Sequence, residues 1–209
     1  MPTCLIMERK RSQSAEARAF PSGWFFENAA AIECGGVAYR LAQHFGVAKE
    51  LLRMRVEPVH PSDPTAIQLL DQLSDTLAGI TGDSGRSSFD PSDVEGAGAS
   101  FVLAYDVQGN ALGCGAYRPL QKGVAELKRM FAIPASKGVG SAVLNDLERR
   151  AEADGYRELW LETRVVNSRA VRFYERNGYR RIPNFGKYVG RPEAVCFAKT
   201  LGRESVMTA

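Results

Sequence analysis

The stretch that decides the fold runs Ala125-Glu-Leu-Lys-Arg-Met-Phe-Ala-Ile-Pro-Ala-Ser-Lys-Gly-Val-Gly140. It begins as an apolar strand, stops at Pro134, passes through a short loop with Gly138 and Gly140, and leads into a helix. Glycine lets a backbone approach a ligand closely, and the first free amides of a helix attract phosphate. The stretch alone therefore fits two interpretations, a pyrophosphate cradle of a coenzyme-using enzyme or an ordinary turn from strand to helix.

The sequence after this loop alternates helices with strands. Apolar residues recur at helical spacing from Val143 to Ala151, and Gly155 is placed to end that helix. A strand over residues 158–162 follows, and a second helix, capped by Asn167 or Ser168, stops at Gly178. Two closing strands are expected at residues 179–182 and 194–201.

The sequence upstream predicts a strand, a helix and a long loop. Residues 55–59 alternate like a first strand, and Asp63-Pro64 opens a helix with Pro64 at its first position. Residues 79–98 are rich in Gly, Ser and Asp and predict a loop on the substrate side, with one helical turn at 91–94. The apolar face expected for the helix consists of Ile67, Leu70, Leu73 and Leu77.

Two apolar runs, 100–107 and 111–118, are joined by Gln108-Gly-Asn110 and predict a β-hairpin. Gly113 and Gly115 within the second run indicate a close approach of another backbone or a local bulge. Another turn at residues 121–123 leads into the strand that begins at Ala125, which makes an antiparallel meander. We therefore expect a mixed α/β fold whose sheet is antiparallel in its first half and has a parallel part in its second.

Residues 1–53 differ from the rest and are expected to form an N-terminal extension, partly disordered or with a short helix at 37–52. The segment is polar and Arg-rich at its start and lacks the apolar core of a secretory signal peptide. Met54 is a second candidate start of the natural chain, and the sequence does not choose between the two. The expected domain is residues 54–201, followed by a flexible tail at 202–209.

Composition limits the classes of function. The 209 residues are 44% hydrophobic and 24% charged, which is typical of a soluble globular protein. The formal net charge of +3, without a dense basic run, argues against nucleic acid as a partner. No apolar run is long enough to span a membrane, so no membrane partner is expected.

Cysteine and histidine are too scattered for a metal site. The cysteines show neither metal-ligand nor disulfide spacing, which favours free thiols in a reducing cytoplasm. The two histidines lie far from any cysteine or carboxylate cluster, so neither a metal centre nor a histidine-based triad is expected. The residues concerned are Cys4, Cys34, Cys114, Cys196, His44 and His60.

Several short motifs between Glu126 and Leu201 occur together in one order and spacing. They are Glu126-Leu-Lys-Arg-Met-Phe-Ala-Ile-Pro134, Gly138-Val-Gly140, Gly155-Tyr156, Leu161-Glu-Thr163, Asn167-Ser-Arg-Ala170, Phe173-Tyr-Glu-Arg-Asn-Gly-Tyr179 and Cys196-Phe-Ala-Lys-Thr-Leu201. Together they resemble the GNAT superfamily of N-acetyltransferases, over about Met54 to Leu201. A Rossmann fold fits less well, because Val143 stands where a third glycine belongs and the loop follows an antiparallel meander.

The resemblance implies the GNAT acyl-CoA N-acyltransferase fold and an acetyl-coenzyme A site between two splayed parallel strands. Backbone groups of Met130, Phe131 and Ala132 would bind the pantetheine arm and the acetyl carbonyl. Fixed backbone donors suit an oxyanion and a phosphate because they need no reorganisation. Asn167 would contact the cofactor, cap its helix, or do both. The amides implied at the pyrophosphate are those of Lys137, Gly138, Val139, Gly140 and Ser141.

The resemblance also implies that acetyl transfers by direct attack of a primary amine. Tyr174 would contact the cofactor and protonate the departing thiolate, although a buried aromatic on an amphipathic helix needs no chemistry. An amine of pKa about 10 must lose a proton first, and a carboxylate can accept it. Glu126 is the first candidate base and Glu162 the second, but Glu126 fits equally a surface pairing with Lys128 or Arg129. No covalent intermediate is expected, and Cys114 and Cys196 fit the core.

One departure from the family pattern concerns the loop. Ala135 stands where the family commonly has Arg or Gln, and the connection from Pro134 to Gly138 is about two residues shorter than usual. Fewer amides would then face the pyrophosphate. We therefore expect a cytoplasmic acetyl-coenzyme A-dependent N-acetyltransferase of a small amine, a homodimer being a common family arrangement. The alternative is a degenerate domain that acts as an acyl-coenzyme A sensor or protein-binding module.

Overall fold

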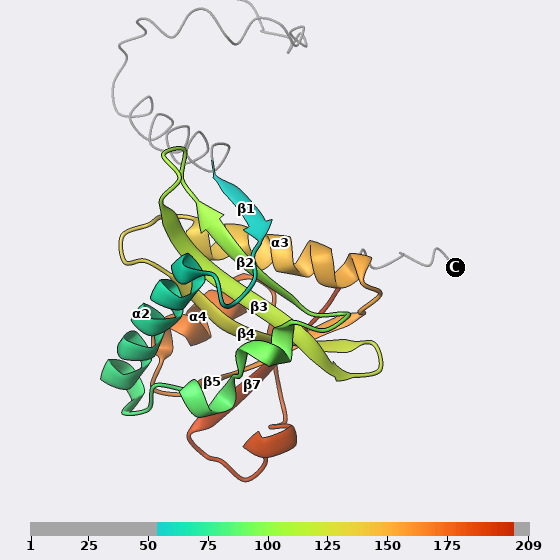
Figure 1. Cartoon of the computed structure of the whole chain (residues 1–209). Coiled ribbons are helices and arrows are strands. Elements are labelled where there is room, and N and C mark those ends of the chain that lie inside the picture. The colour runs from blue at the N-terminus through green and yellow to red at the C-terminus, as the bar shows by residue number, and fades with distance from the viewer. Residues whose placement is uncertain (1–53, 203–209) are drawn as a thin grey trace, which may run out of the picture. The chain divides into compact units, whose positions relative to one another are not determined.

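Seven strands form one sheet in the order β1-β2-β3-β4-β5-β7-β6 in the computed structural model, which describes residues 54–202 (Figure 1). The strands are β1 Arg55–Pro58, β2 Ser100–Tyr105, β3 Ala111–Gln121, β4 Val124–Ala132, β5 Glu158–Arg164, β6 Arg180–Ile182 and β7 Ala194–Thr200. The α-helices are α2 Pro64–Thr81, α3 Val139–Ala153 and α4 Ser168–Arg176, and the 3-10 helices are η1 Arg86–Ser88, η2 Pro91–Val94 and η3 Gly186–Tyr188.

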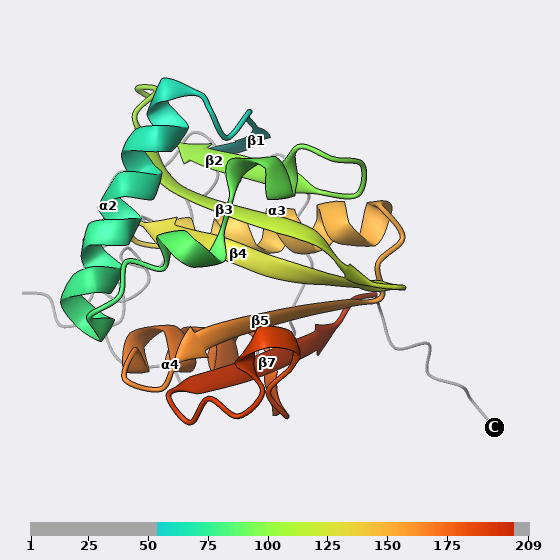
Figure 2. The same ribbon diagram turned by 60° about the horizontal axis from the view of Figure 1, so that its bottom comes forward.

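The parallel part of the sheet is one short pairing between β4 and β5. It extends from Val124 opposite Glu158 to Glu126 opposite Trp160, and the other strand pairings within residues 54–202 are antiparallel. Beyond Glu126 the two strands continue without pairing to each other and diverge (Figure 2). The predicted mixed α/β fold, with an antiparallel meander and a parallel pair, is confirmed.

Helices cover both faces of the sheet because side chains alternate along each strand. On β2, Val102 and Ala104 pack with α3, whereas Phe101 and Leu103 pack with α2 and the two 3-10 helices that follow it. Tyr174 of α4 and Phe197 of β7 belong to the same apolar cluster as the buried residues of α3. Two apolar clusters, one on each face, thereby hold the central strands in place.

Gly113 and Gly115 of β3 lie where a side chain would not fit. A Cβ on Gly113 would be 2.6 Å from the carbonyl oxygen of Phe131, and one on Gly115 would be 2.5 Å from the sulfur of Met130 and 2.8 Å from Leu147. The expected close approach is confirmed, and it brings β4 and α3 against β3.

A β-bulge interrupts the pairing of β3 with β4. Cys114 lies opposite Phe131 and Ala116 opposite Lys128, so Gly115 faces two residues of β4, Arg129 and Met130. Arg129 has a φ of 54°, in the left-handed region that residues other than glycine rarely adopt. A bulge of this kind bends its strand and increases the local twist, so it redirects β4 just beyond the last residue that pairs with β5, Glu126.

Helix α2 begins as predicted, with Pro64 in its first turn and the Asp63 carboxylate accepting from the amide of Thr65 at 2.7 Å. Its predicted apolar face is partly wrong, because Ile67 is 46% exposed and the buried residues are Ala66, Leu69, Leu73 and Ser74. The buried stripe is thus rotated about the helix toward Ala66 and Leu69. The helix also continues to Thr81, and the predicted turn at residues 91–94 is η2.

The expectations for residues 1–53 and 203–209 lie outside the described residues. Between residues 54 and 202, no helix has the length and apolarity needed to cross a bilayer. In the same range, His, Cys, Asp and Glu form no group of three that could hold a metal ion.

Gly113→Ala should destabilise the protein by about 1–3 kcal/mol, the usual cost of adding atoms to a packed core. Its matched control is Gly79→Ala in α2, where an added Cβ meets nothing within 4 Å and the helix gains about 0.5–1 kcal/mol. Urea unfolding of the two variants should therefore shift the midpoint in opposite directions. A neutral or stabilising Gly113→Ala would contradict the close approach.

Candidate active site

Two cavities open where β4 and β5 diverge. One, of about 370 Å³, lies between the end of β4 and the start of α3, and we call it the helix-side cavity. The other, of about 280 Å³, is bounded by the end of α2, the segment after it and the η3 segment, and we call it the loop-side cavity. The residues that line both are Leu73, Leu77, Met130, Asn167, Ala170 and Tyr174. The two cavities therefore meet at the gap between the strands.

The helix-side cavity gathers most of the predicted cofactor residues. Met130, Phe131, Ala132, Gly138, Gly140, Ser141, Asn167 and Tyr174 line it. Lys137 and Val139 are absent from its lining, and the Val139 side chain is fully buried in the core. Gly138 has a φ of 83° and starts α3, whose first amides have no acceptor within the helix. The cavity thus combines a strand edge with a helix N-terminus.

The loop before α3 closes as a tight turn. The amide of Ser136 donates to the carbonyl of Ile133 at 3.1 Å, and the Ser136 hydroxyl donates to the same oxygen at 2.5 Å. Ala135 adopts a φ of 70° and its side chain is exposed. Because the Ser136 amide is used inside the turn, the donors that remain for a ligand are those at the beginning of α3.

Asn167 caps α4. Its side-chain oxygen accepts from the amide of Ala170 at 3.2 Å, which confirms the capping role. Asn167 also lines both cavities, so a contact with a ligand is compatible with the cap.

Tyr174 stands between the two cavities at the base of the gap. It is 7% exposed, and its ring packs edge-on against Phe173 and Tyr179, with centroids 5.3 and 5.6 Å away. Its hydroxyl makes no hydrogen bond to another residue of the described chain, and burial raises its pKa well above the usual value. The phenol is therefore protonated at neutral pH and has its proton to donate.

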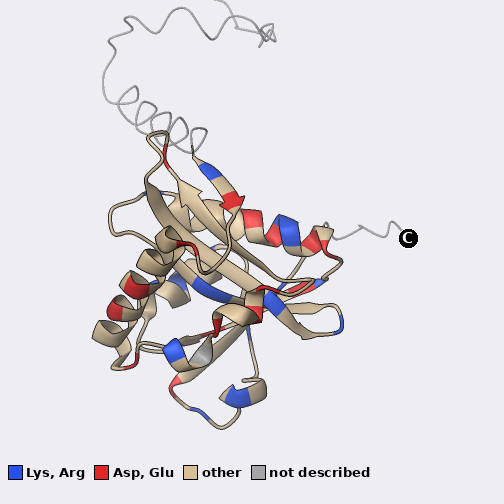
Figure 3. Ribbon diagram, viewed as in Figure 1, with Lys and Arg blue, Asp and Glu red and all other residues tan. Residues whose placement is uncertain are grey.

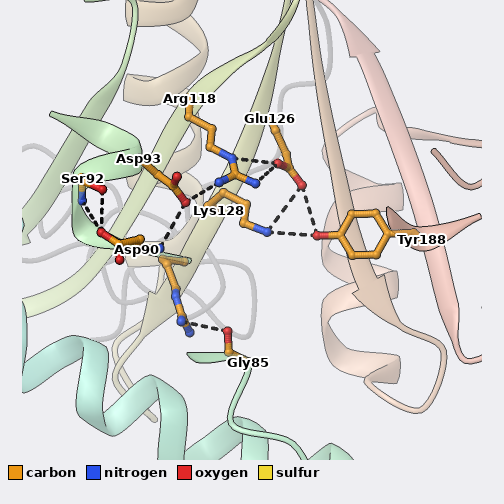
Figure 4. Close-up of polar contacts among 9 residues, drawn as sticks. Gly85, Asp90, Ser92, Asp93, Arg118, Glu126, Lys128 and Tyr188 are labelled. Carbon is orange, nitrogen blue, oxygen red and sulfur yellow. Dashed lines mark hydrogen bonds and ion pairs between the residues drawn. The ribbon is translucent and has the colours of Figure 1, made fainter. Parts of the chain in front are cut away.

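Glu126 lies at the centre of a buried polar network (Figure 4). Its Oε2 accepts from Arg118 Nε at 3.0 Å and Nη2 at 2.9 Å, and its Oε1 accepts from the Tyr188 hydroxyl at 3.2 Å and Lys128 Nζ at 3.4 Å. Arg118 also pairs with Asp93. Both oxygens of this carboxylate, which is 2% exposed, are therefore occupied.

The expected surface pairing of Glu126 is thus a buried one. Of the two partners that the sequence offered, Lys128 pairs with Glu126. Arg129 does not, and its Nη2 donates instead to the carbonyl of Gly85 at 2.9 Å. The sequence did not identify Arg118 or Tyr188 as partners. Arg118 lies directly opposite Glu126 on β3, but only because the register shifts by one residue between Pro119 and Gln121, which the sequence does not show.

Glu162 occupies a different environment on β5. It lines the loop-side cavity and makes no hydrogen bond or ion pair with another residue in the range 54–202. Burial raises its pKa above the ordinary carboxyl value, and the charges of Lys128 and Arg164 partly oppose that rise. The carboxylate is therefore available to a ligand and binds a proton more readily than an exposed one.

Comparison with known proteins agrees with this geometry. The model of the "Acetyltransferase (GNAT) family" matches residues 67–179. An "IAA acetyltransferase" from Azospirillum brasilense is 28% identical over 144 residues, which is 68% of this chain and 94% of that protein.

Solved structures of similar fold cover a similar share of the chain. A Klebsiella pneumoniae protein named as an acyl-CoA N-acyltransferase is 27% identical with a TM-score of 0.61, covering 71% of this chain and 98% of its own. A GNAT acetyltransferase from Elizabethkingia anophelis, solved with acetyl-CoA bound, is 17% identical with a TM-score of 0.50, covering 71% and 99%. The resemblance seen in the motifs is confirmed, and the chain belongs to the GNAT acetyltransferase family.

Proposed function

We propose that this protein transfers the acetyl group of acetyl-coenzyme A to the primary amine of a small molecule. The observation that carries the proposal is the gap between β4 and β5, where two cavities meet beside Met130 and Tyr174. Family membership and the similarity to an acetyltransferase support acyl transfer. In this proposal the coenzyme occupies the helix-side cavity and the amine occupies the loop-side cavity.

The helix-side cavity suits acetyl-coenzyme A. The N-terminus of α3 offers unpaired amides and the positive end of the helix dipole to a pyrophosphate. Beyond Glu126 the edge of β4 that faces β5 has lost its ladder partner. The backbone groups of Met130 and Ala132 on that edge would hold the amide-bearing arm of the coenzyme, as a neighbouring strand would.

The Glu162 carboxylate is the better candidate for the base. An amine must lose a proton to attack the thioester carbonyl, and the base must be within reach of it, directly or through one water. Glu126 is engaged by Arg118, Lys128 and Tyr188, whereas Glu162 is free and lines the cavity. Its raised pKa also moves it toward the range in which a general base works at neutral pH.

The reaction then needs two proton transfers and no covalent enzyme intermediate. Glu162 takes a proton from the amine as the C–N bond forms, and Tyr174 gives its proton to the sulfur as the C–S bond breaks. The buried thiols take no part, since burial raises the pKa of Cys114 to about 12 and also raises that of Cys196. We place the protein in the cytoplasm, where free thiols persist, and infer a homodimer by analogy with the family.

Acetyl-coenzyme A should raise the melting temperature of the protein, by an amount equal to about 2.7 kcal/mol at a hundredfold excess over its Kd. Ser141→Asp should abolish most of that shift, because a carboxylate at the start of α3 repels the pyrophosphate. The same change favours the helix dipole by about 0.3–1 kcal/mol, so the unliganded protein should not be destabilised.

Ser141→Ala is the matched control and should keep the shift. Absence of any shift with millimolar acetyl-coenzyme A in the unmodified protein would contradict the proposed enzyme and instead support a degenerate protein-binding module.

Glu162→Gln should lower kcat/KM by about 10²- to 10⁴-fold, the usual contribution of a general base. In the unmodified enzyme kcat/KM should rise with pH through an apparent pKa above 4.5, because Glu162 must be ionised and its pKa is raised. A raised folded-state pKa means that the folded chain binds this proton more tightly than the unfolded chain. The contribution of Glu162 to stability therefore falls as pH rises, and Glu162→Gln should remove that fall without lowering the melting temperature at pH 7.

Glu126→Gln is the contrasting variant. Removing this charge leaves the buried Lys128 without a counterion and Arg118 with Asp93 alone, which should cost about 3 kcal/mol or more in the free energy of unfolding. Chemical denaturation measures that cost. A stable Glu126→Gln variant with a pH profile shifted like that of a lost base would reassign the base to Glu126.

Tyr174→Phe should reduce the release of coenzyme A thiol by about 10²-fold, at the low end for acid catalysis because a thiolate is already a fair leaving group. The fold should be retained, since the hydroxyl makes no hydrogen bond within the described chain. Turnover and the acetyl-coenzyme A melting shift are measured together. Unchanged turnover would remove Tyr174 from the mechanism.

A further inference from the structure

The loop-side cavity has an excess of basic side chains. Five basic and three acidic residues line it, and basic positions occur both on β4 and around η3 (Figure 3). The basic residues are Lys128, Arg129, Arg164, Lys187 and Arg191, and the acidic ones are Asp83, Glu162 and Glu193. Some of these charges are balanced by ion pairs within the protein and others are not.

Two of the basic residues have counterions within the described chain. Arg164 pairs with Asp83 at 3.0 Å and with Glu193 at 3.3 Å. Lys128 belongs to the Glu126 network. Three basic residues therefore remain without a carboxylate partner in residues 54–202, namely Arg129, Lys187 and Arg191, together with the single unpaired carboxylate of Glu162.

Arg129 is the most confined of the three. Its guanidinium carbon lies 5.0 Å from the ring centroid of Phe89, and Nη2 donates to the Gly85 carbonyl. Its Nε is buried and is the one buried side-chain nitrogen or oxygen without a hydrogen-bond partner in the described part of the chain. Burial also lowers its pKa, so the surroundings disfavour its charge. An arginine without a counterion gains from a charge-assisted hydrogen bond to an anion.

The phosphates of the coenzyme are a poor match for these residues. Arg129, Lys187 and Arg191 line the loop-side cavity but not the helix-side cavity, where the α3 amides lie. The group that reaches the loop-side cavity in the proposed reaction is the acceptor. Its amine must approach Glu162, and the rest of the molecule must then lie among the unpaired cations.

We propose that the acceptor is an amino acid-like molecule, with a primary amine directed to Glu162 and a carboxylate bound by Arg129, Lys187 and Arg191. This inference rests on the proposed function and specifies its substrate class. The unpaired carboxylate of the cavity matches the amine of such a molecule, and the three unpaired cations match its carboxylate. A simple alkylamine would leave the cations unpaired, and a diamine would be repelled by them.

Isosteric pairs of acceptors test the preference. β-Alanine is compared with β-alaninamide, and 4-aminobutanoate with 4-aminobutanamide, using the corresponding diamines as acceptors of opposite charge. With the full-length chain and acetyl-coenzyme A, kcat/KM should favour a carboxylate over its carboxamide by about tenfold or more, the factor that one charge-assisted hydrogen bond is worth. Equal or better transfer to the carboxamides or the diamines would overturn the inference.

Substitutions assign the preference to the cavity. Arg129→Gln and Arg191→Gln should each lower the ratio of carboxylate to carboxamide kcat/KM by about tenfold, mainly through KM. Arg180→Gln is the matched control, because Arg180 is exposed on β6, has no ion pair in residues 54–202 and does not line the cavity. Loss of the acetyl-coenzyme A melting shift in Arg129→Gln would show that the cations serve the cofactor and would overturn the assignment.

Calorimetric titration of the same pairs in the presence of coenzyme A reads the preference without turnover. Tighter binding of the carboxylates with no acetyl transfer would count against the proposed function alone and support this inference. Equal binding of carboxylate and carboxamide, or binding of neither, would overturn the inference while leaving acetyl transfer to be judged by the thiol assay.

Discussion

The short parallel pairing of β4 with β5 is the constraint on which the site depends. A ladder that ends after Glu126 leaves the far half of β4 with an unpaired edge, and unpaired backbone groups must find other partners. The bulge at Arg129 and Met130 bends β4 a few residues beyond that end, in the stretch that borders both cavities. Gly115 makes the bulge compatible with α3, because any larger residue there would collide with Met130 and Leu147.

The Glu126 network compensates for the ladder that is missing. Tyr188, from the segment between β6 and β7, donates to Glu126 and contacts Lys128 at 3.0 Å, so side chains join the two halves of the sheet where backbone bonds do not. Glu126 and Glu162 lie on the two strands of the gap but in opposite environments. One is neutralised by ion pairs and supports the fold, and the other is unpaired, with a raised pKa that suits proton transfer.

Local patterns predicted most of the elements and long-range contacts explain the misses. The turn at Lys122 and Gly123 and the glycines of β3 were readable because each acts on its own neighbours. The Arg118–Glu126 pair was not. A two-residue turn with Gln121 opposite Val124 predicts that Arg118 lies opposite Leu127, whose side chain is on the other face of the sheet. An irregularity after Pro119 shifts the register by one residue and places Arg118 opposite Glu126 instead.

Other misses have the same origin. Tyr188 is 62 residues from Glu126 along the chain, and no periodicity links them. The buried stripe of α2 was placed on Ile67 because helical spacing leaves several faces possible, and the packing of Ala66 and Leu69 against Phe101 and Leu103 selects one. The motifs named residues that line the two cavities, but the different surroundings of Glu126 and Glu162 depend on which carboxylate finds counterions.

Arg129 joins the architecture of the gap to its chemistry. The bulge needs a left-handed residue, for which glycine or asparagine is the easy choice, and holding an arginine there costs on the order of 1–3 kcal/mol. The same residue lines the loop-side cavity with a guanidinium that has no counterion in the described chain. Strain of this kind persists where the surroundings over-determine it, and it concentrates at ligand sites. The residue that redirects β4 therefore also delivers a positive charge to the place where an acceptor would lie, so the shape of the gap and its charge have one source.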